Sequence, residues 1–225
     1  MLVVISILVA IFLIAAPAVS SVIQANRLTA AGGQVLSLLA LAQQMALVEG
    51  RPVEIRFTQY TRVGSSDPYY QTITLSRYYS PGEIGPDGRM VPTSAISVLA
   101  ADPVVLPNGI IISSQISISN IIGNNFTTVS AQGGGGGGNV ATLENYSGGS
   151  LTPYNWGSTD SAQSPQNYCS VIIRPNGTSL PDPTQTWYFT LIDETKATQP
   201  DISTINNFYT IAIDPINGHA TSYRP

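Results

Sequence analysis

Charged side chains are scarce in this chain. Asp, Glu, Lys and Arg together make up only 10% of its 225 residues, and the formal net charge is -4. Nine basic residues spread thinly over an acidic chain provide no electrostatic footprint for nucleic acid. We therefore expect no nucleic-acid partner. The surface must consist mainly of Ser, Thr, Asn, Gln and Gly, a composition that we interpret as extracytoplasmic.

Cysteine and histidine occur once each, which restricts the possible chemistry. Cys169 cannot form an internal disulfide and precedes an apolar run, so we expect a buried, inert thiol, with pairing to another chain as the alternative. His219 lies in a predicted turn, where a polar surface role is a simpler interpretation than a catalytic triad. We expect no enzyme activity and no cofactor. Calcium remains an alternative, although the acidic candidates match no cation-loop spacing; they are Asp182, Asp193, Glu194 and Asp201.

The N-terminal stretch contains the longest apolar run. From Met1 to Ile23 the only polar side chains are serines, and the first charge is Arg27. About 20 apolar residues at roughly 1.5 Å each match a hydrocarbon core about 30 Å thick. A cleaved secretory signal would have a shorter apolar region behind basic residues. We therefore predict a transmembrane helix over residues 1–25, kinked at Pro17.

The next segment is predicted to be an amphipathic continuation of the same helix over residues 26–50. Its apolar residues recur at spacings of three and four, which is typical of one buried helix face. The residues expected to pack on the head are Leu28, Val35, Leu38, Ala42 and Met45, with Ala31 between them. Gly50 is expected to end the helix, and the pair Gly32 and Gly33 should be its weakest point.

The rest of the chain, residues 51–225, is predicted to be a β-rich head. After Gly50 the apolar period changes from 3.6 to 2, which indicates strands, and the terminal segment 208–223 resembles a hairpin. Further strands are expected at Tyr69–Tyr79, Gly109–Ser119, Ser170–Arg174, Trp187–Asp193 and Phe208–Asp214. We therefore predict an α+β fold, in which the helix covers one face of an antiparallel sheet. A glycine-rich stretch at about 131–150 should form a flexible loop.

Several segments resemble the type IV pilin and pseudopilin superfamily. The uncharged opening helix Leu2–Ile11, with a proline one-third along the predicted helix, carries the superfamily resemblance. The junction Leu39–Ile55 is similar to that of the minor pseudopilin H and FimT-like subgroup. The closing strands of that subgroup are similar to three segments of this chain, Ile173–Thr178, Trp187–Leu191 and Ile213–Gly218. The stretch from Arg27 to Phe57 is most similar to a prepilin-like group called Verru_Chthon cassette protein D.

The resemblance implies a structural subunit of a type IV pilus-like or type II secretion-like filament. Such a subunit crosses the inner membrane once, with an extracytoplasmic head. Its partners are other pilin-like subunits, the inner-membrane assembly machinery and the lipid bilayer. The side chains that would contact the membrane, and then neighbouring helices in the filament, are Leu2, Val3, Val4, Ile5, Ile7, Leu8, Val9, Ile11, Phe12, Leu13, Ile14 and Pro17.

Two other functions remain as alternatives. The first is a solitary membrane-anchored binding module that never polymerises. The second is a DNA-uptake minor pilin, which is disfavoured because Arg224 is the only basic residue near the C-terminus and DNA binding needs several phosphate contacts.

The start of the sequence departs from the family pattern. Family precursors carry a basic leader ending in Gly and a Glu at the fifth mature position, and none of these precedes Leu2. Met1 stands where the family has leucine. We therefore hypothesise an upstream start that restores the site for a prepilin peptidase.

Overall fold

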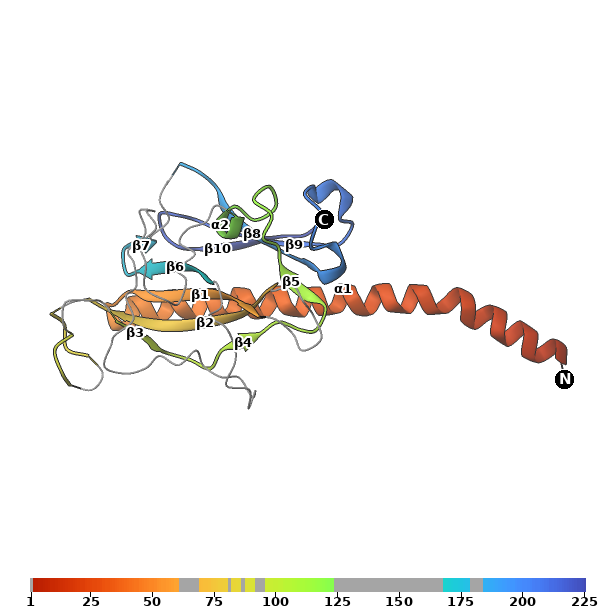
Figure 1. The fold of residues 1–225 in the computed structure, drawn as a ribbon, viewed down its shortest axis with the longest axis horizontal. Helices are drawn as coiled ribbons and strands as arrows, with labels where there is room; N and C mark the ends of the chain where they lie inside the picture. The colour runs from red at the N-terminus through yellow and green to blue at the C-terminus, as the bar shows by residue number, and fades with distance from the viewer. Residues whose placement is uncertain are drawn as a thin grey trace.

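The computed structural model describes residues 2–60, 69–80, 82–85, 88–91, 96–123, 168–178 and 184–225. In these residues one long helix, α1 (Leu2–Glu49), lies against an antiparallel sheet (Figure 1). The predicted α+β class and the order of its parts, helix first and sheet after, are confirmed. The glycine-rich stretch predicted as a loop lies outside the described residues.

The sheet runs in the order β10-β9-β8-β5-β2-β1-β6-β7, with β3 and β4 also paired to β2. Every pairing between described strands is antiparallel. The strands are β1 Val53–Tyr60, β2 Tyr69–Tyr79, β3 Ile96–Leu99, β4 Val104–Val105, β5 Ile110–Ile112, β6 Tyr168–Arg174, β7 Gly177–Thr178, β8 Trp187–Asp193, β9 Tyr209–Ile213 and β10 Ala220–Tyr223. A short helix α2 (Asn120–Gly123) and two 3-10 turns, η1 (Glu194–Lys196) and η2 (Ile202–Thr204), complete the fold.

The helix ends where the sequence predicted, at a glycine. Gly50 adopts a left-handed conformation with φ of 61°, which residues other than Gly and Asn rarely tolerate. The amide of Arg51 then donates to the carbonyl of Ala46 at 3.2 Å, closing a Schellman motif. The chain leaves this turn directly into β1, so the helix end and the first strand are joined by a short, hydrogen-bonded connection.

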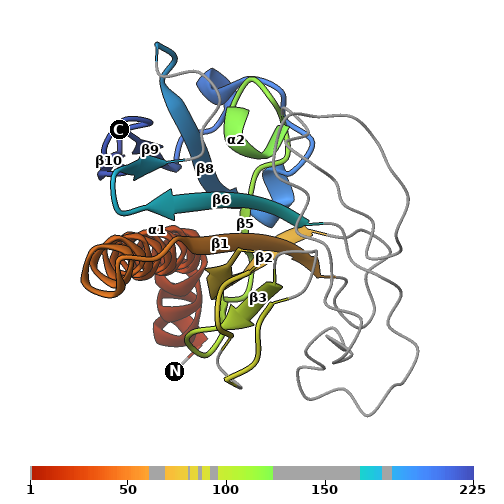
Figure 2. The same cartoon turned by 90° about the vertical axis from the view of Figure 1, so that its left-hand side faces the viewer.

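One face of the sheet packs on α1. Val53, Ile55 and Phe57 alternate along β1 and are fully buried in the main core. The ring of Phe57 lies 5.0 Å from that of Phe189 on β8, a tilted aromatic pair. The helix contacts β1, β5, β6, β8, β9 and β10. Viewed from the end of the molecule, these strands curve around it (Figure 2).

Part of the opposite face, over β5 and β8, is covered too, so the prediction of one covered face was incomplete. A second buried cluster lies there, formed by Ile111, Ile118, Ile192 and Ile205. Ile111 and Ile192 alternate with residues that face α1 and therefore point away from it. At β5 and β8 the sheet is therefore buried on both faces.

The predicted strand Gly109–Ser119 was too long, because only β5 at its start is a strand. The strand ends at Ile112, and the chain then turns back over the second face. Serine hydroxyls bond to backbone in this turn, because Ser119 accepts from the amide of Thr190 at 3.0 Å. The Thr190 hydroxyl donates in turn to the carbonyl of Ile118 at 2.6 Å. The alternation of apolar residues and serines after Ile112 therefore belongs to a turn and not to a strand.

The predicted C-terminal hairpin is present. β9 and β10 pair in antiparallel register from Ile213 with Ala220 to Thr210 with Tyr223. In the turn, Asp214 Oδ1 accepts from the amide of Ile216 at 2.8 Å, as turn aspartates do. The short strands β3, β4 and β7 were not predicted, because runs of two to four residues carry no clear period.

Candidate functional site: the long helix and its docking surface

Only the inner half of α1 belongs to the head. Figure 1 shows this half lying along the sheet, whereas the outer half continues past the head to the N-terminus and bends on the way. Among the side chains that the structure describes, the window Val22–Glu49 alone is long and apolar enough to cross a membrane by length and composition. That window has one face buried on the sheet.

The residues expected to contact the membrane all lie in this outer half. The stretch Leu2–Pro17 is helical throughout, so Pro17 does not end the helix. Of its side chains the structure describes Val4, which is 62% exposed. A helix of 48 residues at about 1.5 Å per residue is roughly 70 Å long, about twice a bilayer's hydrocarbon core. Its length therefore accommodates both a docked half and a spanning half.

The docking face of α1 is the one that the apolar spacing indicated. Four of the residues expected to pack on the head are buried, and Met45 is partly buried against the same core. The buried four are Leu28, Val35, Leu38 and Ala42. Sequence analysis missed Leu39 and Ala46, which are also buried and which widen the stripe by one position at each turn. The adjacent leucines at positions 38 and 39 were the signal in the sequence that indicated the wider buried stripe.

A glycine allows the sheet to approach α1 very closely. A Cβ on Gly32 would lie 2.6 Å from three atoms of the Tyr209 ring on β9, whereas a Cβ on Gly33 would meet nothing within 4 Å. The tyrosine ring therefore occupies the space that any larger residue at position 32 would need. The glycine pair, predicted only as a weak point, contains one residue required for packing and one that is not.

Ion pairs fix the far end of α1 to the sheet. Arg77 on β2 donates hydrogen bonds to both carboxylate oxygens of Glu49. The shortest of them is 2.8 Å, from Nε to Oε2. Arg51 pairs with Glu83 at 3.0 Å and lies 4.3 Å from the centre of the Tyr79 ring. A carboxylate at a helix C-terminus is disfavoured by the helix dipole, and Arg77 offsets that penalty.

The Glu49 pair predicts a small, pH-dependent contribution to stability. The hydrogen bond from Arg77 holds the pKa of Glu49 below its usual range. Because the folded pKa is depressed, the pair stabilises above the unfolded pKa and loses this effect as pH falls through the folded value. Glu49→Gln should cost less than about 1 kcal/mol at pH 7, since both partners are about one-third exposed.

Urea unfolding of wild type and Glu49→Gln at several pH values measures the contribution of the Glu49–Arg77 pair to the free energy of unfolding. The difference between wild type and Glu49→Gln should begin to shrink as pH falls through the ordinary carboxylate range and should disappear only below the depressed folded pKa of Glu49. A difference that persists unchanged into strong acid would contradict the assignment.

The other side chains singled out in the sequence have structural positions. Cys169 is buried, its thiol lies 3.3 Å from the carbonyl of Ile121, and burial raises its pKa to about 12. Such a thiol is neither a nucleophile nor accessible to another chain. His219 is exposed. Asp193 and Asp201 cap η1 and η2 by accepting from the amides of Thr195 and Ser203.

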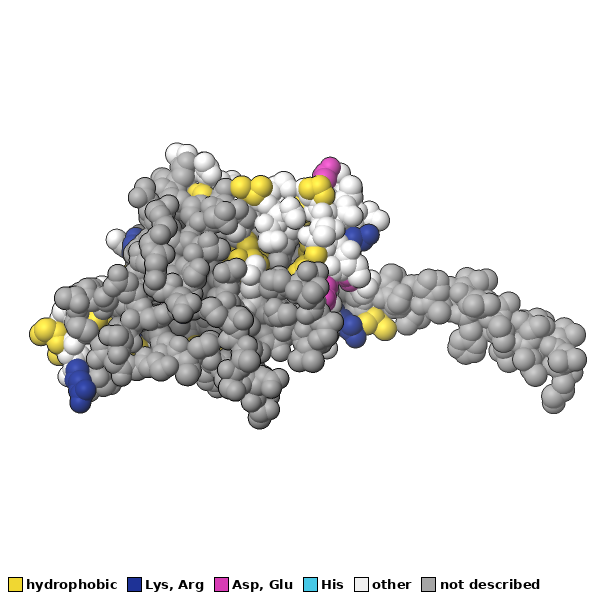
Figure 3. Space-filling view, viewed as in Figure 1, with side chains coloured by type: hydrophobic (Ala, Val, Ile, Leu, Met, Phe, Trp, Pro, Cys, Tyr) yellow, Lys and Arg dark blue, Asp and Glu magenta, His cyan; other side chains and the backbone are white. Residues whose placement is uncertain are grey.

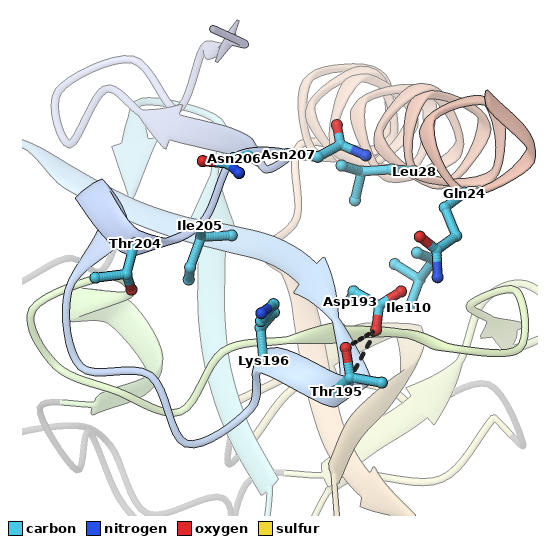
Figure 4. Close-up of a pocket in the computed structure, with 10 residues that line it drawn as sticks. All are labelled: Gln24, Leu28, Ile110, Asp193, Thr195, Lys196, Thr204, Ile205, Asn206 and Asn207. Atoms are coloured by element: carbon cyan, nitrogen blue, oxygen red, sulfur yellow. Dashed lines mark hydrogen bonds between the residues drawn. The ribbon is translucent and has the colours of Figure 1, made fainter. Parts of the chain in front are cut away.

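A shallow pocket of about 160 Å³ lies beside the inner half of α1 (Figure 4). It is formed by α1, the start of β5, the end of β8 with η1, and the chain between η2 and β9. Its lining residues are Gln24, Leu28, Ile110, Asp193, Thr195, Lys196, Thr204, Ile205, Asn206 and Asn207. Arg224, the C-terminal arginine considered for DNA binding, hydrogen-bonds to Thr29 of α1 and to Asn207.

The described residues contain no group of three or more His, Cys, Asp or Glu side chains that could hold a metal ion. Asp182, the remaining calcium candidate, lies outside them. The main feature of the described structure is therefore the long helix. Its inner half is docked on the sheet, and its outer half projects beyond the head. Comparison with protein-family models, curated proteins and solved structures found no match to this chain.

Proposed function

We propose that this chain is a membrane-anchored, pilin-like structural subunit. The outer half of α1 spans the bilayer, and the inner half carries the sheet as a head outside it. The observation that carries the proposal is the coincidence of two boundaries on one helix. The apolar run ends at Ile23, and among the described side chains of α1 the first that is buried on the sheet is Leu28, about one helical turn later.

The hydrophobic effect explains why the outer half needs an apolar partner. Its sequence offers no polar face to water, because its only polar side chains before Gln24 are serines. A contiguous apolar surface of this size marks a membrane or protein interface. In a bilayer the partner is lipid. In a filament the same side chains would contact the outer helices of neighbouring subunits.

The resemblance to type IV pilins and pseudopilins suggests that this arrangement belongs to a filament subunit. A subunit of that kind is held in the inner membrane with its head on the extracytoplasmic side, and assembly machinery moves it into a pilus-like or secretion filament. The chain would then act as a building element and would catalyse no reaction. The hydrogen-bonded turn at Gly50 and the ion pairs beyond it support a head that keeps one orientation relative to the helix.

Membrane fractionation tests the anchor. The full chain should sediment with membranes and be released by detergent but not by high salt, because its attachment is apolar. A fragment of residues 26–225 keeps every described α1 residue of the core, from Leu28 onward, and should remain in the soluble fraction with a folded circular dichroism spectrum. A full chain that is soluble without detergent would refute the anchor.

Cysteine cross-linking distinguishes a filament subunit from a solitary anchored module. Val9→Cys and Phe12→Cys place a thiol in the outer half of α1, and Ser203→Cys places one on the exposed surface of the head. The native Cys169 is buried and should give no background. We expect oxidation of membranes that contain the assembly machinery to give linked species from the helix positions. Only monomer at both helix positions would favour the solitary module.

A further inference from the structure

The pocket beside α1 lies at the level where the membrane surface should be. Gln24 and Leu28 form its helix side, and Gln24 is the first residue after the apolar run that ends at Ile23. Immediately before it in sequence, Val22 and Ile23 are 58% and 46% exposed, on other sides of the helix than Gln24 and Leu28. If the outer half of α1 spans the bilayer, acyl chains surround the helix up to Ile23, and lipid headgroups lie at the level of Gln24 and the pocket.

The lining of the pocket suits a small polar group. Its volume of about 160 Å³ is well above the ~10–15 Å³ that a single water needs. Leu28, Ile110 and Ile205 supply apolar contacts. The remaining seven side chains are polar, with one cation, Lys196, and one anion, Asp193, on the same side of the pocket (Figure 4).

The polar groups have defined orientations. Asp193 makes both of its hydrogen bonds to Thr195 through Oδ1, at 2.9 and 2.6 Å, which leaves Oδ2 to accept from a ligand. Asn207 accepts from Arg224 Nη2 at 3.3 Å through its Oδ1, so its amide nitrogen remains a donor. Lys196 is exposed and is the one ammonium in the lining. The pocket thus presents donors for an anionic oxygen and a carboxylate for a cation.

We propose that this pocket binds the headgroup of a phosphatidylethanolamine-type phospholipid from the membrane in which α1 is anchored. The phosphate accepts from Lys196 and Asn207, and the primary ammonium donates to Asp193. A headgroup with both charges matches a lining with both charges, whereas an anionic phosphatidylglycerol would leave Asp193 without a cation. A methylated phosphatidylcholine cannot donate a hydrogen bond to it. This inference rests on the anchor proposed above.

Native mass spectrometry of the full chain in mild detergent tests the proposal. An equimolar mixture of phosphatidylethanolamine, phosphatidylcholine and phosphatidylglycerol is added, and the lipid retained by each protein molecule is counted. Wild type should retain one phosphatidylethanolamine, at least about fivefold over phosphatidylcholine, as expected for one charge-assisted hydrogen bond. Water-soluble glycerophosphoethanolamine should compete only weakly, because it lacks the acyl contacts.

Two variants and a control test the proposed contacts with the headgroup. Asp193→Asn retains the side-chain oxygen that caps η1 and should bring the ratio of ethanolamine to choline lipid close to one. Lys196→Gln should reduce retention of all phospholipids. Arg174→Gln removes an exposed cation on β6, outside the pocket lining, and should change nothing.

Equal retention of the three lipids by wild type, or a preference for phosphatidylglycerol, would overturn the headgroup site. Neither result would affect the anchor, because fractionation with membranes is measured separately. An unchanged lipid ratio in Asp193→Asn would likewise refute the proposed ammonium contact.

Discussion

Replacing Leu39 by alanine should lower the free energy of unfolding by about 2–5 kcal/mol, the usual cost of a cavity in a well-packed core. Leu39 is 1% exposed and belongs to the main core between α1 and the sheet. Strands from both halves of the sheet meet α1 there, so little rearrangement is available to fill the space. Urea unfolding of the full chain in a mild detergent, followed by circular dichroism, measures the change.

Leu41→Ala is the matched control for this experiment. It makes the same chemical change two residues along the same helix, but Leu41 is 39% exposed. We expect a loss below about 1 kcal/mol, as for most partly exposed positions. Equal losses at positions 39 and 41 would mean that the inner half of α1 does not dock through the face described above.

Gly32→Ala should destabilise the protein even though alanine is the better helix former. The added methyl group would lie 2.6 Å from the Tyr209 ring, and overpacking of this kind costs about 1–3 kcal/mol. The helix-propensity gain of about 1 kcal/mol offsets only part of that cost. The same urea experiment reports the net effect, and the fluorescence of the tyrosines offers a second readout of the displaced ring.

Gly33→Ala separates the two contributions. The neighbouring glycine is exposed and has open space around it, so its replacement should stabilise by up to about 1 kcal/mol. Because the propensity gain is common to both variants, the difference between them measures the clash alone. Stabilisation by both substitutions would contradict the close approach of Tyr209 to α1.

The long helix and several strands could be predicted because their patterns are periodic. Spacings of three and four between 28 and 45 identify the buried face of α1, and alternation locates Tyr69–Tyr79 and Trp187–Asp193 at the bounds observed for β2 and β8. Gly50 followed by Pro52 marks the helix end correctly, because the left-handed turn needs a residue without a side chain.

Other features depend on contacts between distant residues and leave no local pattern. Ile111, Ile118 and Ile192 form a second cluster only because the chain turns back after Ile112, where hydrogen bonds to Thr190 favour the turn over a longer strand. The packing role of Gly32 depends on a tyrosine 177 positions away in sequence. The pocket likewise combines four separate segments, and none of its residues forms a recognisable motif.

The continuous path from α1 through Gly50 into β1 determines how the head would respond to tension. Because α1 lies along the sheet before it turns into β1 near Glu49 and Arg77, a pull on the outer half loads the docked half along its own axis (Figure 1). Figure 3 shows Lys and Arg side chains, in dark blue, at both ends of the head. The pull is directed along the helix, so its contacts with six strands must shear together instead of separating one at a time. A subunit built this way should yield abruptly at a high force, with few intermediate extensions.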